Sequence, residues 1–320
     1  MPARDGWDPR RLPNQSGKVF LVTGGSRGIG YFIAEQLAGA GARVVIAARD
    51  EARARRAIGS IERRIDGAEV GFLPLDLASQ ASARTAGEAV AEWDRLDGIA
   101  ANGAVTWLPS SQRPVRQTTT DGIELNFATN HLGHFVLAAT AWPALARTAG
   151  SRFVSMGSIA MQLAPVRAHR LETALGAGGR YSEFRAYALS KHALAGFAWE
   201  LDRRLRAVGS DSIALAAHPG DSADGLTAAR AGITGIGRSP IDLAGERVIA
   251  FMAQGKNHGA TPMVRALTDP AADGGAYYGP AYGLKGAPVP RKPRGASSRP
   301  EFGRELWRLS ERLTGVEFRP

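Results

Sequence analysis

Tyr187 and Lys191 stand four residues apart in a segment whose apolar residues follow helical spacing. Residues at i and i+4 share one face of a helix, so the lysine ammonium group would lie beside the phenol. A nearby cation favours the phenolate and lowers a tyrosine pKa of about 10 toward the range of a working general acid or base. The pair therefore predicts proton-transfer chemistry. The alternative is an ordinary pair on a helix surface.

A glycine-rich segment follows the first apolar run of the chain. In a strand–turn–helix context such glycines permit a tight turn, let the backbone approach a pyrophosphate and let the helix pack close to the sheet. The segment predicts a dinucleotide site, with a glycine-rich turn that binds nothing as the alternative. The residues expected at the cofactor are Gly24, Ser26, Arg27, Gly28, Ile29 and Gly30.

The end of the second predicted strand indicates which dinucleotide binds. A carboxylate there would accept a hydrogen bond from the ribose of NAD and repel a 2′-phosphate. The sequence instead has two alanines followed by Arg49, and Arg27 lies in the glycine segment. Two guanidinium groups can hold a phosphate, although Asp50 beside Arg49 slightly weakens the argument. NADP(H) is therefore expected in preference to NAD(H).

The elements that position these residues alternate along the chain. Alternating apolar strands and amphipathic helices are typical of a single doubly wound parallel sheet flanked by helices, an α/β fold of the Rossmann type. Strands are expected at 19–22, 43–47, 70–75, 97–101, 152–156 and 212–217. Helices are expected at 29–37, 81–93, 122–147 and 184–208, and a further helix follows the second strand and ends at about residue 64.

We predict three regions in the chain. Residues 1–17 form an N-terminal extension and residues 18–265 a dinucleotide-binding catalytic domain. Residues 266–320 form a C-terminal extension, rich in Gly and Pro, that ends in a helix at 301–313.

The composition excludes several classes of protein. The 320 residues include no Cys, which excludes disulfides and thiolate chemistry. No apolar run approaches the roughly 18–20 residues of a membrane helix, and no secretory core is present, so a cytoplasmic protein is expected. The net charge is +10 and is concentrated at the two ends. Basic ends fit an anionic partner or solvated tails; the second is favoured, and no nucleic-acid partner is expected.

The spacing TGxxxGxG and the motif YxxxK together resemble the short-chain dehydrogenase/reductase family over about residues 17–265. The resemblance implies that Tyr187 donates or accepts the proton, and that Lys191 tunes the tyrosine and binds the cofactor ribose. It also implies a catalytic serine at the end of the fifth strand. We place this serine at Ser158, with Ser155 as the alternative.

Further positions follow from the same resemblance. Asn130, in the string Asn-His-Leu-Gly-His-Phe, matches a family Asn that holds a water in a proton relay. Two departures from the family pattern affect the cofactor contacts. One is the stretch 101–104, and the other is Asp224, which replaces a Thr that contacts the nicotinamide amide. The additional residues expected to bind the cofactor are Asp76, Leu77, Asn102, Gly103, Pro219 and Gly220.

Ser158 and Tyr187 are 29 residues apart, a longer connection than most of the family has. This insertion, the Asn130 string and the sequence His218-Pro219-Gly220 resemble the retinol-dehydrogenase-like branch. The loops at 105–120, 160–183 and 221–240 should line an apolar substrate pocket through Trp107, Leu108, Met161, Leu163, Leu171, Leu226 and Ile233.

The expected function is NADP(H)-dependent interconversion of a carbonyl and an alcohol, on a small-molecule substrate. The alternative is a catalytically silent nucleotide-binding regulatory protein of the same fold. His131 and His134 have a spacing that could serve a metal, but no third ligand is evident nearby, so no metal is expected. The resemblance also allows a homo-oligomer that pairs through the two long helices.

Overall fold

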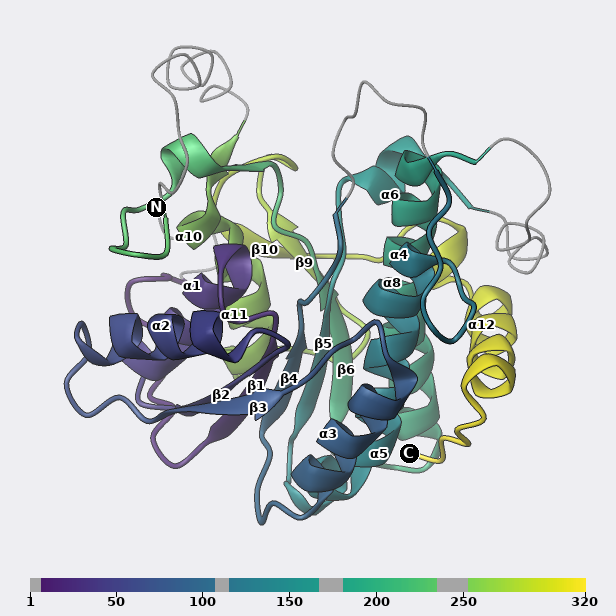
Figure 1. Cartoon of the computed structure of the whole chain (residues 1–320), viewed down its shortest axis with the longest axis horizontal. Helices are drawn as coiled ribbons and strands as arrows, with labels where there is room; N and C mark the ends of the chain where they lie inside the picture. Colours follow the sequence, from purple (N-terminus) through teal and green to yellow (C-terminus); the bar gives the residue numbers. More distant parts are fainter. Residues whose placement is uncertain (1–6, 107–114, 167–180, 235–252) are drawn as a thin grey trace.

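Six apolar runs of the sequence form the parallel strands of one central sheet (Figure 1). The computed structural model describes residues 7–106, 115–166, 181–234 and 253–320. The six strands are β1 (Val19–Thr23), β2 (Arg43–Ala48), β3 (Val70–Pro74), β4 (Gly98–Ala101), β5 (Arg152–Met156) and β6 (Ile213–Ala217).

The sheet has eight strands in the order β10-β9-β6-β5-β4-β1-β2-β3. Strand β9 (Tyr277–Pro280) pairs parallel with β6, and β10 (Pro288–Arg291) pairs antiparallel with β9 at the edge. The strand order reverses beside β1, which pairs with both β2 and β4. In doubly wound sheets this reversal places a crevice at the carboxyl ends of the strands.

Helices cover both faces of the sheet. The longer ones are α1 (Gly28–Gly39), α2 (Glu51–Glu62), α3 (Gln80–Ala91), α5 (Gly133–Arg147), α8 (Glu183–Ala207), α11 (Thr261–Thr268) and α12 (Pro300–Thr314). The short ones are α4 (Leu125–Phe127), α6 (Ala160–Leu163), α10 (Lys256–Gly259), the π-helix η1 (Ala128–Leu132) and the 3₁₀ turns η3 (Asp224–Leu226) and η4 (Ala296–Ser298). Strands β7 (Ser222–Ala223) and β8 (Gln254–Gly255) form a separate pair.

Two hydrophobic cores lie on opposite faces of the sheet. One contains side chains of α1, α2 and α11, and the other contains side chains of α3, α5, α8 and α12 (Figure 1). Adjacent residues of β1 divide between them, with Leu21 in the second core and Val22 in the first. Burial on both faces explains why the strands are apolar without alternation. The doubly wound parallel fold predicted from the sequence is confirmed.

The predicted helix at 122–147 is divided in the structure. The carboxylate of Glu124 accepts a hydrogen bond from the backbone N–H of Phe127 at 2.8 Å and caps α4, so the helix begins at Leu125 rather than Gly122. The π-helix η1 then precedes α5. Such bulges re-aim the side chains they carry, and this one carries Asn130.

The C-terminal region contributes more to the core than its composition predicts. Strands β9 and β10 lie in a segment expected to be irregular, because Gly and Pro disfavour central strands. Two of the four residues of β10 are prolines, which an edge strand tolerates. The boundary predicted at residue 265 falls within α11. Helix α12 packs on α8, and its Trp307 ring lies 5.5 Å from that of Phe197.

Among the helices that the structure describes, none combines the length and apolar composition needed to cross a membrane.

Candidate functional site

Ser158 and Tyr187 are brought together at the carboxyl end of the sheet. Ser158 follows β5, and Tyr187 lies near the start of α8, with the insertion between them. Both side chains are half-buried. Burial raises the pKa of the Tyr187 phenol, and a hydrogen bond from Ser158 lowers it in part. The lowered pKa expected from the lysine pairing is therefore wrong for this structure, because burial dominates.

Lys191 lies one helical turn after Tyr187 on the same face of α8. Its Nζ donates to the carbonyl oxygen of Met156 at 2.9 Å and lies 5.9 Å from the Tyr187 ring centroid. The side chain is buried, and burial lowers its pKa to about 8. The shared face predicted from the spacing is present, and the ammonium group is anchored at the end of β5.

The alternative serine occupies a different environment. Ser155 is fully buried within β5, and its Oγ donates to the carbonyl oxygen of Leu215 in β6 at 3.4 Å. A hydroxyl held between two strands cannot reach a substrate. Ser158 lies beyond the strand end and contacts Tyr187, so the geometry favours it over Ser155.

Asn130 uses its side chain to join three segments. Its Oδ1 accepts from the backbone N–H of Val105 at 2.8 Å. Its Nδ2 donates to the Val105 carbonyl at 3.0 Å and to Ser190 Oγ at 2.9 Å. The side chain thus positions the loop after β4 against α8.

The glycine segment has the backbone that a pyrophosphate requires. Gly24 and Gly28 have φ values of +67° and +59°, which glycine adopts without strain. A Cβ on Gly30 would lie 2.6 Å from Nδ2 of Asn102 and would also strike the carbonyl oxygen of Gly24. Helix α1 has no side-chain cap and no acidic residue in its first turn. Its first N–H groups therefore face an anion site, and the segment fits a dinucleotide phosphate.

The hydrogen bond between His134 and Thr23 was not anticipated from the sequence. Thr23 Oγ1 accepts from the backbone N–H groups of Asn102 (2.9 Å) and Gly103 (2.8 Å). Burial lowers the pKa of His134 to about 4, so its ring is neutral at pH 7. Its Nδ1 donates to the Asn130 carbonyl at 3.0 Å, so its Nε2 accepts from the Thr23 hydroxyl at 2.9 Å. This network joins the glycine segment to η1.

The two arginines predicted to bind a 2′-phosphate lie on adjacent loops. Gly24 donates its N–H to the Ala47 carbonyl at 2.8 Å, so the glycine segment begins beside the end of β2. Arg27 and Arg49 both have exposed side chains. Asp50 caps α2 by accepting from the N–H of Arg53 at 2.9 Å, and this hydrogen bond lowers its pKa. The carboxylate therefore caps the helix and keeps its negative charge beside Arg49.

The remaining predicted cofactor residues surround the same edge. Asp76 Oδ1 accepts from the N–H of Ala78 at 2.9 Å. Asn102 Nδ2 donates to the Thr23 carbonyl at 3.0 Å. Ser26 is buried, Ile29 packs partly against the α1 core, and Leu77 packs against Gly103. Pro219 and Gly220 follow β6, and Gly220 has a φ of +69°.

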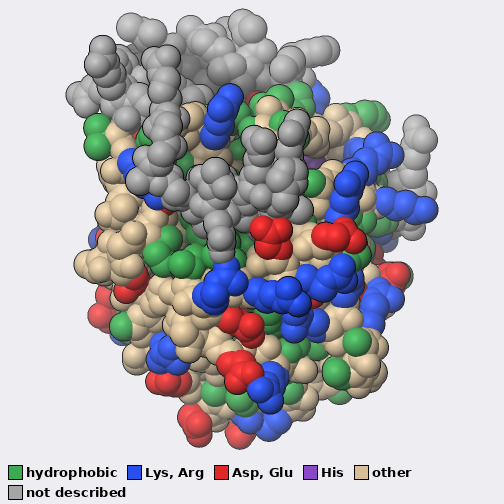
Figure 2. Space-filling view, turned by 90° about the vertical axis from the view of Figure 1, so that its right-hand side faces the viewer, with side chains coloured by type: hydrophobic (Ala, Val, Ile, Leu, Met, Phe, Trp, Pro, Cys, Tyr) green, Lys and Arg blue, Asp and Glu red, His purple; other side chains and the backbone are tan. Residues whose placement is uncertain are grey.

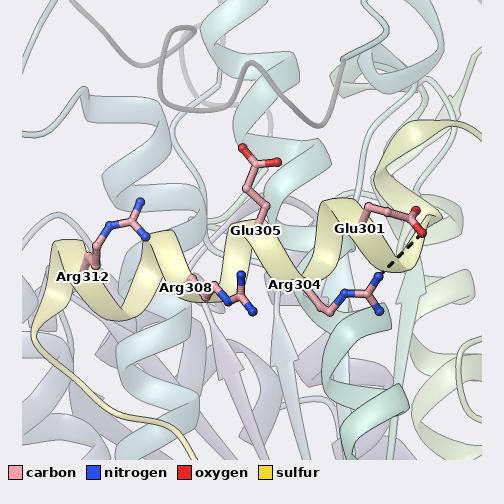
Figure 3. Close-up of a pocket in the computed structure, with 5 residues that line it drawn as sticks. All are labelled: Glu301, Arg304, Glu305, Arg308 and Arg312. Atoms are coloured by element: carbon pink, nitrogen blue, oxygen red, sulfur yellow. Dashed lines mark ion pairs between the residues drawn. The ribbon is translucent and has the colours of Figure 1, made fainter.

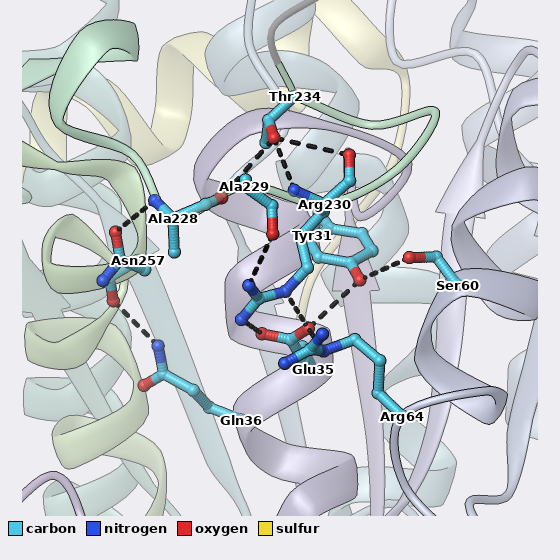
Figure 4. A network of polar contacts seen from close by, with 10 residues as sticks. All are labelled: Tyr31, Glu35, Gln36, Ser60, Arg64, Ala228, Ala229, Arg230, Thr234 and Asn257. Carbon is cyan, nitrogen blue, oxygen red and sulfur yellow. Dashed lines mark hydrogen bonds and ion pairs between the residues drawn. The ribbon is translucent and has the colours of Figure 1, made fainter.

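The loop after Gly220 folds back onto α1. Glu35 forms a buried ion pair with Arg230, with Nε–Oε1 and Nη2–Oε2 distances of 2.6 and 2.8 Å (Figure 4). Tyr31 also donates to Glu35 at 3.1 Å, and Arg64 lies 3.2 Å from it. No signal in the sequence alone indicates this pairing, because its members are 195 residues apart.

The residues expected to line a substrate pocket have different surroundings. Met161 is buried, Leu163 is exposed, and Ile233 packs against the α1 core. Leu226 is half-buried. Trp107, Leu108, Leu171 and residues 235–240 lie outside the described residues.

A second concave surface lies on the outer side of α12, far from the catalytic residues in sequence. It is lined by Arg304, Arg308 and Arg312 with Glu301 and Glu305 (Figure 3). All five belong to one helix face, and Arg304 pairs with Glu301 at 3.7 Å. The surface carries side chains of both charges, and none of the predicted catalytic residues lines it.

Comparisons with known proteins identify the family of the chain. The family model for short chain dehydrogenases matches residues 18–168. Mouse polyprenol dehydrogenase is 35% identical over 321 residues, which cover 98% of this chain and 88% of that protein. Mouse retinol dehydrogenase 12 is 37% identical over 64% of this chain. The chain spans 61% of that relative and 56% of a Colletotrichum higginsianum short chain dehydrogenase/reductase.

Solved structures with a similar fold include members of the same family. A putative uncharacterized protein from Mycobacterium paratuberculosis superposes with a TM-score of 0.75 at 29% identity, covering 98% of both chains. A short chain dehydrogenase from Burkholderia cenocepacia in complex with NADP has a TM-score of 0.60 at 26% identity, covering 86% of this chain and 98% of that one. The chain therefore belongs to the short-chain dehydrogenase/reductase family, in its retinol-dehydrogenase-like branch, and is an oxidoreductase.

Proposed function

We propose that this protein is an NADP(H)-dependent oxidoreductase that interconverts a carbonyl and a primary or secondary alcohol. The observation that carries the proposal is the contact between Ser158 and Tyr187 at the carboxyl end of the sheet, where the glycine segment also lies. A nicotinamide bound there supplies or accepts the hydride. The protein's own groups orient the substrate and move the proton.

In the reducing direction each catalytic residue has one role. Ser158 donates a hydrogen bond to the substrate carbonyl oxygen and orients it. Tyr187 donates its phenolic proton to the same oxygen as negative charge develops. Lys191 stabilises the resulting phenolate and binds the ribose, and Asn130 holds the relay water. In the oxidising direction Tyr187 accepts the alcohol proton.

The preference for NADP(H) rests on Arg27 and Arg49. Their exposed guanidinium groups lie on adjacent loops at the adenosine end of the site, while the neighbouring carboxylate of Asp50 caps α2. Asp76, Leu77, Asn102 and Gly103 would contact the adenosine half, and Pro219 and Gly220 the nicotinamide half. The proposed substrate is a large apolar alcohol or the corresponding carbonyl compound, because relatives of the chain are named for polyprenol and retinol.

Arg49→Ala tests the cofactor assignment. We expect the variant to bind NADPH about tenfold or more weakly and to bind NADH as the wild type does, because the charged hydrogen bond to the 2′-phosphate is lost. Quenching of tryptophan fluorescence on titration measures both affinities. Arg43→Ala, which removes an exposed arginine at the opposite end of β2, should change neither. Equal weakening of both nucleotides would contradict the assignment.

Tyr187→Phe tests the chemistry. With retinal and other apolar aldehydes plus NADPH, we expect a loss of about 100-fold or more in kcat, since the general acid is removed. The affinity for NADPH should stay within about twofold. Tyr282→Phe, at an exposed tyrosine, is the matched control and should keep full activity. Tight cofactor binding by the wild type without turnover of any carbonyl would instead support the silent regulatory protein.

A further inference from the structure

Lys256 approaches the glycine segment from a distant part of the chain. It begins α10, and its Cδ lies 4.0 Å from the position that a Cβ would occupy on Gly28. Gly28 is the first residue of α1 and has a φ of +59°. The lysine side chain is only 24% exposed. The aliphatic part of its side chain therefore passes close to the start of α1, where a pyrophosphate would lie.

The backbone at Lys256 is fixed by three contacts. Its N–H donates to Thr227 Oγ1 at 3.0 Å. The next residue, Asn257, accepts from Gln36 of α1 at 2.8 Å through its carbonyl (Figure 4). Its side-chain Oδ1 accepts from the N–H of Ala228 at 3.1 Å. Because Gln36 belongs to the helix that begins at Gly28, α10 is tied to the phosphate-binding helix itself.

The ammonium group is paired with Asp224. The Nζ–Oδ1 distance is 2.5 Å, and the aspartate side chain is 61% exposed. An exposed carboxylate can be replaced as the partner of the lysine at little cost, because water solvates it in either state. Asp224 stands where the family pattern has a Thr, and a lone carboxylate there would repel a phosphate. The lysine neutralises that charge.

We infer that Lys256 is a ligand of the cofactor pyrophosphate and that Asp224 is its partner when the nucleotide is absent. This inference rests on the proposed function and assigns one more residue to its site. The N-terminus of α1 offers N–H donors and about half a positive charge. A pyrophosphate carries two negative charges, and a lysine ammonium is a compact point charge suited to them.

Nucleotide affinities test the inference without measuring turnover. NADPH and NADH share the pyrophosphate and differ at the 2′-phosphate. Lys256→Gln should therefore weaken both nucleotides about tenfold or more and by the same factor. Arg49→Ala should weaken NADPH alone. Lys292→Gln removes one exposed lysine after β10 and controls for the change in net charge; it should leave both affinities unchanged.

Asp224→Asn provides an independent variant that keeps the lysine. We expect it to tighten both nucleotides about two- to fivefold, because the ammonium group no longer leaves a carboxylate. A weaker affinity in Asp224→Asn would overturn the role of Asp224 as the resting partner. Thermal unfolding of each variant identifies a general loss of structure, in which case Lys256→Arg, expected to keep most of the affinity, replaces Lys256→Gln.

The outcomes separate this inference from the function on which it rests. If Lys256→Gln leaves both affinities unchanged, Lys256 is not a ligand and the oxidoreductase proposal stands. If it weakens NADPH alone, the lysine binds at the 2′-phosphate and the pyrophosphate assignment is wrong. If the wild type binds neither nucleotide at millimolar concentration, the proposed function itself fails.

Discussion

At the scale of single residues, burial shifts the pKa values of Tyr187 and Lys191 more than the contact between the two side chains does. It raises the pKa of Tyr187 and lowers that of Lys191 to about 8, so burial shifts both groups toward their neutral forms, although Lys191 stays mostly protonated at pH 7. The hydrogen bond from Ser158 opposes this trend at the tyrosine. A site of this kind is sensitive to any charge that enters it, because little water is present to screen that charge.

The buried lysine predicts a dependence of stability on pH. The unfolded chain holds the Lys191 proton up to pH 10.5 and the folded protein only up to about pH 8. Between these values the unfolded state binds more protons than the folded state, so the free energy of unfolding rises with pH. The stability that the lysine contributes at high pH is lost as the pH falls through 8. The free energy of unfolding of the wild type, minus that of Lys191→Met, should increase by about 1–3 kcal/mol from pH 7.5 to 10. Urea titrations measure it, and an unchanged difference would show that the buried amine stays charged.

At the scale of elements, the site depends on short segments fixed by side chains. The π-helix η1 carries Asn130, whose side chain hydrogen-bonds to the loop after β4. The Asn130 carbonyl also accepts from His134 at the start of α5, and His134 in turn contacts Thr23. His131 points the other way, with Nε2 donating to Ser310 of α12 at 2.7 Å. One turn of irregular helix thus connects the catalytic edge with the C-terminal helix.

Arg230 predicts how the loop after β6 is held. Arg230→Ala should lower the free energy of unfolding by about 2–4 kcal/mol, because Glu35 would keep a buried charge with one partner fewer. The segment 221–234 should also become more sensitive to proteases. Arg304→Ala, which breaks the exposed pair with Glu301, should cost less than about 0.5 kcal/mol. Equal effects of the two changes, measured by chemical unfolding, would refute the structural role of the buried pair.

At the scale of the whole molecule, the C-terminal region completes the fold. Phe318 stacks on Trp307 with ring centroids 5.0 Å apart, and both rings join the aromatic core around Phe135 and Phe197. Figure 2 shows Lys and Arg side chains in a band on the α12 side of the molecule, with Asp and Glu around them. Three of the basic C-terminal residues, Arg304, Arg308 and Arg312, belong to α12 and not to an irregular tail. Pairing of two copies through α8, which the family resemblance allows, would have to include α12.

The local features of the protein were predictable from its sequence alone. The six strands, the glycine turn and the shared face of Tyr187 and Lys191 follow from periodicity and residue type, which act over a few neighbouring residues. Family resemblance then supplied Ser158 and Asn130 across longer separations, and those roles stay predictions.

The tertiary structure was needed to show which distant groups meet. It assigned Asp50 to the cap of α2, placed Ser155 between two strands and brought Lys256 beside Gly28. It also added β9 and β10 to the sheet despite their prolines and glycines. Local propensity does not predict these features, because each depends on the packing of segments far apart in the chain. The contacts between those segments outweigh the conformational preferences of single residues.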